Sequence, residues 1–230
     1  MEQLHELALF AGAGGGILGG HLLGWKTVCA VELEDYPRRV LLARQKDGIL
    51  PRFPIWDDVT TFNGQPWRER VDVVSGGFPC QRFSSATHGR QTAPDLTKEF
   101  ARVVGEIRPS FVFAENVSAD AVGGLARELY PLGYITSGVK ISAQDVGADH
   151  LRRRYWTLAY TNSHCELCLP IHEKASVVQE FCVDVWKSGP DELRVANGMA
   201  DRVVRIKAIG NGQVPAVAAL AWNILSEGLV

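Results

Sequence analysis

A cysteine on a stiff turn is the first candidate for chemistry in this sequence. Cys80 follows Pro79 and the pair Gly76 and Gly77, after a short β-branched run that begins at Val71. Such a run bounded by glycines predicts a buried strand that ends in a sharp turn. Open α/β sheets bind ligands at the carboxyl ends of their strands, so the turn offers Cys80 as a nucleophile. A buried, inert thiol is the alternative that this turn alone leaves open.

Charged residues stand at the ends of two further apolar runs. Residues 110–117 predict a strand whose carboxyl end carries Glu115, so this acid is expected in the same crevice as Cys80. Arg152 and Arg154 belong to the densest basic cluster of the chain, which opens another apolar run. These arginines are therefore either held at a site or part of an ordinary solvated charge run.

A glycine-rich turn near the N-terminus predicts a site for a nucleoside-containing cofactor. Apolar residues 7–10 give way to glycines, after which apolar side chains recur at helical spacing. Glu32 ends the next strand pattern, where a carboxylate typically holds the two ribose hydroxyls. Gly14, Gly16 and Gly19 also satisfy the dinucleotide pattern GxGxxG. A nicotinamide dinucleotide, or a turn that only packs a helix on the sheet, therefore remains an alternative.

Strand and helix patterns alternate along most of the chain. Helical spacing at residues 35–46, 96–107 and 120–130 separates apolar strand patterns, and a closing helix is expected at 216–225. This alternation predicts an α/β fold, a Rossmann-like sheet with helices on both faces. The periodicity is lost over residues 162–189, which predict a small irregular segment.

Composition sets broad limits on the class of protein. A chain of 230 residues fits one domain with a small appendage, and it has no apolar run of about 18 residues that would span a bilayer. Five cysteines without a disulfide-like framework favour free thiols and a cytoplasmic location. The net charge of −2 argues against a generally basic surface, so any contact with nucleic acid must come from a local patch.

A zinc site is the competing interpretation of the irregular segment. Cys165, Cys168, His172 and Cys182 supply the right ligand types. A single Cys-x-x-Cys without a second clean pair is a weak signal, however, and the remaining spacings are not those of a common zinc ribbon or finger. We therefore expect no metal.

Taken together and in this order, the motifs resemble those of the DNA (cytosine-5) methyltransferase family. The resemblance covers most of the chain. The turn from Gly76 to Gln81 is similar to the family's Pro-Cys-Gln turn, with Phe78 where proline is more usual. Residues 115–117 resemble its Glu-Asn-Val triplet. The arginine cluster resembles its Gln-x-Arg-x-Arg pattern, with His150 in place of the glutamine.

The resemblance implies a role for each motif residue. The residues that it makes catalytic are Cys80, Glu115, Arg152 and Arg154. It implies S-adenosyl-L-methionine as the cofactor, and the expected contacts are Phe10, Ala11, Gly12, Gly14, Gly15, Glu32, Asp58, Pro79, Leu96, Asn211 and Val214.

The implied reaction is transfer of a methyl group to carbon 5 of cytosine in duplex DNA, through a covalent Cys80 adduct on a flipped-out base. An RNA cytosine-5 methyltransferase and a silent cofactor- or DNA-binding subunit are the alternatives. We expect a catalytic and cofactor domain at 1–160, a short target-recognition segment at 161–194 and a returning segment at 195–230. A bacterial or phage-like cytoplasmic protein is implied. Whether a restriction endonuclease accompanies it, and its oligomeric state, stay open.

Overall fold

A mixed β-sheet forms the centre of the molecule. The computed structural model describes residues 3–79, 96–161, 208 and 210–229. Within these residues seven strands lie in the order β3-β2-β1-β4-β5-β7-β6. Every strand pair is parallel except those of β7, which runs antiparallel to both of its neighbours. The strands are β1 (His5–Leu9), β2 (Lys26–Val31), β3 (Ile55–Trp56), β4 (Val73–Gly77), β5 (Phe111–Asn116), β6 (Tyr134–Ser142) and β7 (Arg153–Thr161).

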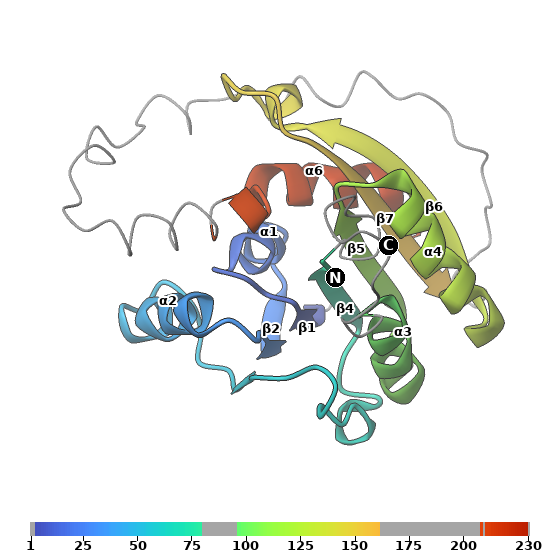
Figure 1. Cartoon of the computed structure of the whole chain (residues 1–230), viewed down its shortest axis with the longest axis horizontal. Coiled ribbons are helices and arrows are strands. Elements are labelled where there is room, and N and C mark those ends of the chain that lie inside the picture. Colours follow the sequence, from blue (N-terminus) through green and yellow to red (C-terminus); the bar gives the residue numbers. More distant parts are fainter. Residues whose placement is uncertain (1–2, 80–95, 162–207, 209, 230) are drawn as a thin grey trace, which may run out of the picture.

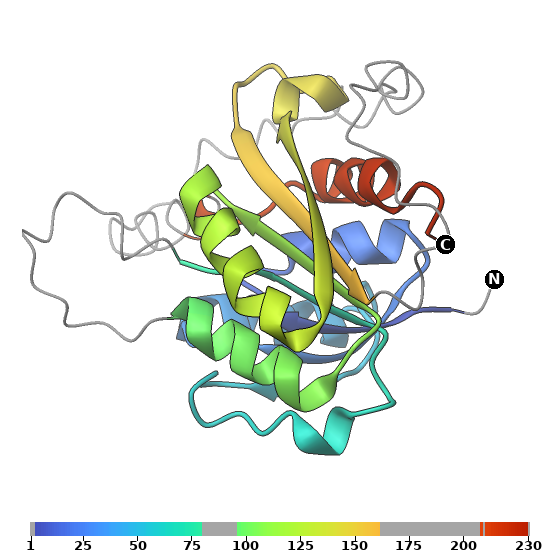
Figure 2. The same cartoon turned by 90° about the vertical axis from the view of Figure 1, so that its right-hand side faces the viewer.

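Helices cover both faces of the sheet. Figures 1 and 2 show α1, α2 and α6 on one face and α3 and α4 on the other. Their bounds are α1 (Gly15–Leu22), α2 (Asp35–Lys46), α3 (Leu96–Ile107), α4 (Ala119–Leu129) and α6 (Pro215–Ser226). Short 3₁₀ turns are η1 (Gln65–Trp67), η4 (Tyr130–Leu132) and η5 (Ala143–Val146). The predicted Rossmann-like α/β fold is confirmed. In this described part, no helix has the length and apolar character needed to cross a membrane.

The two-faced packing follows from the alternation of side chains along buried strands. Leu7 and Leu9 of β1 pack into the core beneath α3 and α4, which includes Phe100. Ala8, between them, packs with Ile17 of α1 and Leu41 of α2. Successive side chains of a strand point to opposite faces, so a continuously apolar strand supplies both cores at once.

The edge strand β3 is shorter than its sequence pattern predicts. Residues 51–59 read as one strand, yet only Ile55 and Trp56 pair with β2. Pro51 and Pro54 fall in the same stretch, and proline has no N–H to donate to a neighbouring strand. The carbonyl of Pro54 still accepts a hydrogen bond from Ala30 at 3.0 Å. The backbone therefore follows β2 without forming a regular ladder.

The reversed direction of β7 brings charged residues to the functional edge of the sheet. In the β5–β7 pairing, Glu115 lies opposite Trp156 and Asn116 lies opposite Tyr155. The beginning of β7 therefore meets the end of β5. Arginines that precede or open β7 reach the carboxyl edge of the parallel strands, where an acid leaves β5.

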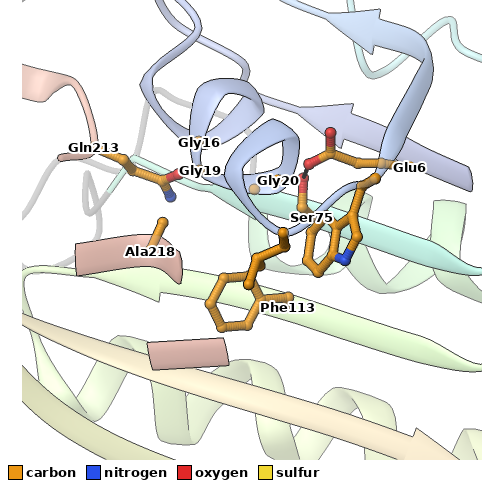
Figure 3. Close-up of a pocket in the computed structure, with 11 residues that line it drawn as sticks. Glu6, Gly16, Gly19, Gly20, Ser75, Phe113, Gln213 and Ala218 are labelled. Atoms are coloured by element: carbon orange, nitrogen blue, oxygen red, sulfur yellow. Dashed lines mark hydrogen bonds between the residues drawn. The ribbon is translucent and has the colours of Figure 1, made fainter. Parts of the chain in front are cut away.

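A fully buried carboxyl group, that of Glu6, ties three neighbouring strands together. Thr27 of β2 donates to Glu6 Oε2 at 2.7 Å, and Ser75 of β4 donates to Oε1 at 2.6 Å. The carboxyl group borders a small hollow that is also lined by Gly20 and Trp25 (Figure 3). Burial raises the pKa of Glu6 from 4.5 to about 7, and the two hydrogen bonds only partly offset it.

This raised pKa predicts a stability that depends on pH. Because the folded protein holds the Glu6 proton more tightly than the unfolded chain, the contribution is complete below about pH 4.5 and is lost as pH rises to about 7. The loss amounts to about 3 kcal/mol of unfolding free energy. Denaturant unfolding of Glu6→Gln from pH 4.5 to 8 should show a correspondingly flatter profile.

The exposed Glu69 offers a matched control, since Glu69→Gln also removes one acid. That variant should keep the parent's decline in stability between pH 4.5 and 7. If the stability of Glu6→Gln falls as much as that of the parent between pH 4.5 and 7, a group other than Glu6 causes the decline.

Candidate active site

The turn that leads to the candidate nucleophile is anchored on the neighbouring strand. Phe78 is buried after the end of β4, and its ring meets Phe100 edge-on with centroids 6.0 Å apart. Its carbonyl accepts a 2.7 Å hydrogen bond from Asn116 Nδ2 at the end of β5. Pro79 follows and is exposed. Cys80 and residues 81–95 lie outside the described residues, so the backbone is defined up to the residue before the thiol.

Glu115 forms an ion pair with Arg154 at this edge. Arg154 Nε lies 2.8 Å from Glu115 Oε1, and the side chains are 18% and 7% exposed. Burial raises the pKa of Glu115 above its ordinary value, although the charges of Arg154 and Arg152 and a hydrogen bond from Gln213 oppose the rise. The site therefore contains a desolvated carboxyl group whose proton is held more tightly than in water.

Arg152 binds the segment that precedes α6. Its Nη2 donates to the carbonyl of Gly210 at 2.7 Å and also to the carbonyl of Gly212. Burial and the nearby Arg154 lower the pKa of Arg152. The family resemblance also implies that Arg152 orients the loop after Cys80, and this loop lies outside the described residues. The contacts that are described tie Arg152 to the turn around Asn211.

The glycine turn is joined to the predicted ribose-binding acid. Glu32 Oε2 accepts from Gly12 N at 2.7 Å, and Oε1 accepts from Glu34 N at 2.8 Å. Gly12 and Gly14 have φ of 54° and 91°, a region that suits glycine. Phe10 has φ of 52° at the start of the turn, where a side chain is uncommon, and its ring stacks on Phe100. The turn is therefore held in one shape.

A small hollow that is open to solvent lies over this turn. Predicted cofactor residues that line it are Phe10, Ala11, Gly12 and Asn211, and Gly76, Gly77 and Gln213 close it from β4 and the segment before α6.

The remaining predicted cofactor residues do not line this hollow. Asp58 follows β3, and its Oδ1 accepts from the N–H and hydroxyl of Thr60, both at 2.8 Å. Leu96 opens α3 and packs on the core beneath it. Val214 packs with the core beneath α6. Gly14 is buried, with its Cβ position facing Leu41, and Gly15 lies against Gln213.

Sequence reasoning missed two residues of this site. Asn116 was noted within the triplet, but its role as donor to the Phe78 carbonyl needs the pairing of β4 with β5. Gln213 donates from Nε2 to Glu115 Oε2 at 3.4 Å across 98 positions of sequence. An amide that directly follows an acid at a strand end is a local signal for Asn116. For Gln213 only the adjacent glycine-rich turn hinted at a close approach.

Comparison with known proteins identifies the family. The family model of C-5 cytosine-specific DNA methylases matches residues 4–181. The chain belongs to this family. Because a C-5 cytosine-specific DNA methylase carries out methyl transfer, S-adenosyl-L-methionine is the implied methyl donor, and the nicotinamide alternative is set aside.

Relatives and solved structures within this methylase family cover the chain to different extents. The type II methyltransferase M.Eco47II of Escherichia coli is 39% identical over 118 residues, 48% of this chain and 26% of that protein. M.CviJI of Paramecium bursaria Chlorella virus IL3A is 30% identical over 237 residues, 98% of this chain and 60% of that protein. The chain thus spans less than two thirds of these relatives.

The fold likeness extends to a solved structure. A DNA modification methyltransferase encoded in an Escherichia coli prophage aligns with a TM-score of 0.56 and 26% identity, over 74% of this chain and 49% of that one. The likeness agrees with the mixed seven-stranded sheet described above.

The described residues fit a cofactor that carries a ribose. A carboxylate has about four lone-pair positions, and Glu32 uses two of them for Gly12 N and Glu34 N. Two positions are left to accept hydroxyl groups. The cysteine and histidine residues of the zinc alternative, Cys165, Cys168, His172 and Cys182, lie outside the described residues, as do most of 161–194 and part of 195–230.

Proposed function

We propose that the protein transfers a methyl group from S-adenosyl-L-methionine to carbon 5 of cytosine in duplex DNA, with Cys80 as the nucleophile. One observation carries most of the weight. The buried Glu115 carboxyl group, paired with Arg154 at 2.8 Å, lies near the end of the strand that also anchors the turn leading to Cys80. The backbone just before Cys80, an acid and a cation thus meet at one sheet edge, next to the hollow over the glycine turn.

Cysteine chemistry answers the difficulty of this reaction. Carbon 5 of cytosine is a poor nucleophile, so the ring needs activation. Addition of the Cys80 thiolate to C6 turns C5 into the nucleophilic end of an enamine, which takes the methyl group that the cofactor supplies. Loss of the C5 proton then expels the thiolate and restores the ring. A base inside a duplex is out of reach, so the cytosine must be flipped into the site at a cost of a few kcal/mol.

Glu115 and the arginines would handle the charge that develops on the ring. As a protonated or hydrogen-bonded partner of N3, Glu115 takes up charge when the thiolate adds, which suits a carboxyl group with a raised pKa. Arg154 would hold the cytosine O2 and also keep Glu115 in position. Arg152 would act at a distance, by fixing the turn around Asn211.

Cofactor binding would rest on the glycine turn and Glu32. Phe10, Ala11, Gly12, Gly14 and Gly15 bring the backbone close to the cofactor, and Glu32 accepts from the ribose hydroxyls. Asp58 and Leu96 are assigned to the adenine, Asn211 lines the hollow, and Pro79 and Val214 are assigned as cofactor contacts on the family pattern alone. The sulfonium of the cofactor supplies the methyl group.

The assignment of Glu32 predicts a loss of cofactor affinity. Glu32→Ala removes a charged acceptor, and hydrogen bonds to charged groups are worth about 1.5–3 kcal/mol, so the Kd for S-adenosylhomocysteine should rise roughly tenfold or more. Isothermal titration calorimetry measures this directly. Glu34→Ala is the matched control, because the contact of Glu34 with Glu32 is made by its backbone N–H. Equal affinity in the parent and Glu32→Ala would contradict the role of Glu32.

Duplex DNA is the substrate that the family supports best. Residues 161–194 leave little length for reading bases, so a short target of about two to four base pairs is expected. RNA recognised by shape is the alternative substrate, and a silent subunit that needs a partner chain is the alternative role. A cytoplasmic location and a cognate restriction endonuclease accord with the type II names of the relatives.

A nucleoside assay separates these functions. The purified chain is incubated with isotope-labelled S-adenosyl-L-methionine and either duplex DNA or transfer RNA, and the digested nucleosides are identified by mass spectrometry. The proposal predicts labelled 5-methyldeoxycytidine from DNA. Label in RNA alone would favour the RNA alternative, and no transfer to either would favour the silent subunit.

A further inference from the structure

The segment before α6 places one amide side chain between the cofactor hollow and the catalytic acid. Gln213 lies between Gly212, whose carbonyl is bound by Arg152, and Val214, whose carbonyl accepts from Ala218 at 3.0 Å in the first turn of α6. Its backbone is therefore held on both sides. Gln213 lines the hollow over the glycine turn and also the hollow beside Glu6, where Figure 3 shows it near Gly16.

Three glycines make room for Gln213. A Cβ on Gly15 would collide with the Gln213 carbonyl oxygen, and a Cβ on Gly16 would collide with its Oε1. A Cβ on Gly77, at the end of β4, would lie 3.0 Å from its Nε2 and 2.9 Å from Glu115 Oε2. The glycines at the start of α1 and at the end of β4 thus leave room for this residue. The close approach of Gly16 and Gly77 to the side-chain amide limits the rotamers that Gln213 can adopt.

Within the described residues, the amide is a second donor to the carboxylate. Arg154 Nε donates to Glu115 Oε1 at 2.8 Å, and Gln213 Nε2 donates to Oε2 at 3.4 Å. The charged groups that act on Glu115 in the described residues are Arg154 and Arg152, both near the beginning of β7. Gln213 contacts the other carboxylate oxygen, and it comes from the same segment as Asn211.

We propose that Gln213 is a positioning residue that fixes the Glu115 carboxyl group through its side-chain amide and links it to the glycine turn of the cofactor site. The inference rests on the function proposed for Glu115. Because the amide donates to the ionised carboxylate, its loss favours the protonated acid and leaves the carboxyl group free to rotate. The turn that closes the cofactor hollow thereby also sets the state of the acid.

The test removes the amide but keeps the shape. Gln213→Met has a similar length and no donor, and the pKa of Glu115 can be followed by carbon-13 NMR titration of its carboxyl carbon, assigned with Glu115→Gln. The midpoint should move to higher pH in Gln213→Met and further in Gln213→Glu, which adds a like charge. Gln65→Met, at an exposed position in η1, controls for the substitution and should leave the midpoint unchanged. An unshifted midpoint in both folded Gln213 variants overturns the proposal.

Rates then test the link to catalysis. At a pH below both midpoints, where Glu115 is protonated in parent and variant alike, single-turnover methyl transfer should fall by about five- to tenfold in Gln213→Met, because the acid loses one hydrogen bond that holds its orientation. In a Glu115→Gln background, Gln213→Met should lower the single-turnover rate by less than about twofold. The effects of substituting two interacting residues are not additive. Equal costs in both backgrounds would overturn the coupling. A second outcome separates this inference from the proposed function. If the midpoint shifts in the Gln213 variants but Glu115→Gln methylates at the parent's rate, the proposed function is contradicted and the contact between Gln213 and Glu115 is still supported.

Discussion

Cys80→Ala is expected to abolish methyl transfer while the affinity for S-adenosylhomocysteine stays within a few-fold of the parent. In the proposed mechanism the Cys80 thiolate adds to the base, and alanine offers no nucleophile. The cofactor contacts proposed for Glu32 and the glycine turn do not involve this side chain. A radiometric transfer assay on duplex DNA, with calorimetry on the same samples, measures both quantities.

Cys29 provides the control for this experiment. It is a free, buried thiol on β2, and burial raises its pKa to about 12, so it is almost wholly un-ionised near neutral pH. Cys29→Ala should therefore retain transfer per folded molecule. Activity that survives in Cys80→Ala would mean that the nucleophile is a different residue.

Glu115→Gln should lower the rate of transfer by about two to four decades, the range ascribed to general acid–base groups. Glutamine keeps the shape and still accepts from Arg154, so the fold should hold. Under the proposed role the protonated acid is the active form, so the parent's rate should fall as pH rises through the pKa of Glu115. That alkaline decline should vanish in the variant. Single-turnover rates measured across pH report both effects.

Glu106 is the matched control for Glu115. It also pairs with an arginine, Arg102 at 2.7 Å, but it braces the N–H of Gly64 away from the sheet edge. Glu106→Gln should lower the free energy of unfolding and leave the rate of methyl transfer per folded molecule unchanged. A near-parental rate in Glu115→Gln would contradict the role assigned to that acid.

Local patterns predicted the helices and most strands closely. The expected helices at 35–46 and 96–107 match α2 and α3 residue for residue. Apolar periodicity and turn glycines are properties of neighbouring residues, so they can be read along the chain. The strand expected at 51–59 is longer than β3, which covers only Ile55–Trp56. The prediction rested on the apolar residues of this stretch and gave too little importance to its prolines, which cannot donate a hydrogen bond to a neighbouring strand.

Contacts between distant residues could not be predicted in this way. An apolar run in the sequence does not show whether the strand will pair parallel or antiparallel to its neighbour. The antiparallel direction of β7 nevertheless decides that Arg154 meets Glu115. The sequence alone gives no reason for an acid, Glu6, within an apolar strand. The structure supplies the reason, because Thr27 and Ser75, 21 and 69 positions away, donate hydrogen bonds to its carboxyl group. The roles of Glu115 and Arg154 came from the family resemblance, whereas Gln213 needed the three-dimensional structure.

The most direct test of the central claim is to trap the covalent intermediate. In the proposed mechanism, release of the enzyme requires loss of a proton from C5, and fluorine at that position cannot leave in the same way. A duplex containing 5-fluorocytosine at a methylated site should therefore form a stable protein–DNA adduct that depends on S-adenosyl-L-methionine. Peptide mass spectrometry should locate the modified base on Cys80. Absence of an adduct with an actively methylating protein, or an adduct on any other residue, would contradict the mechanism.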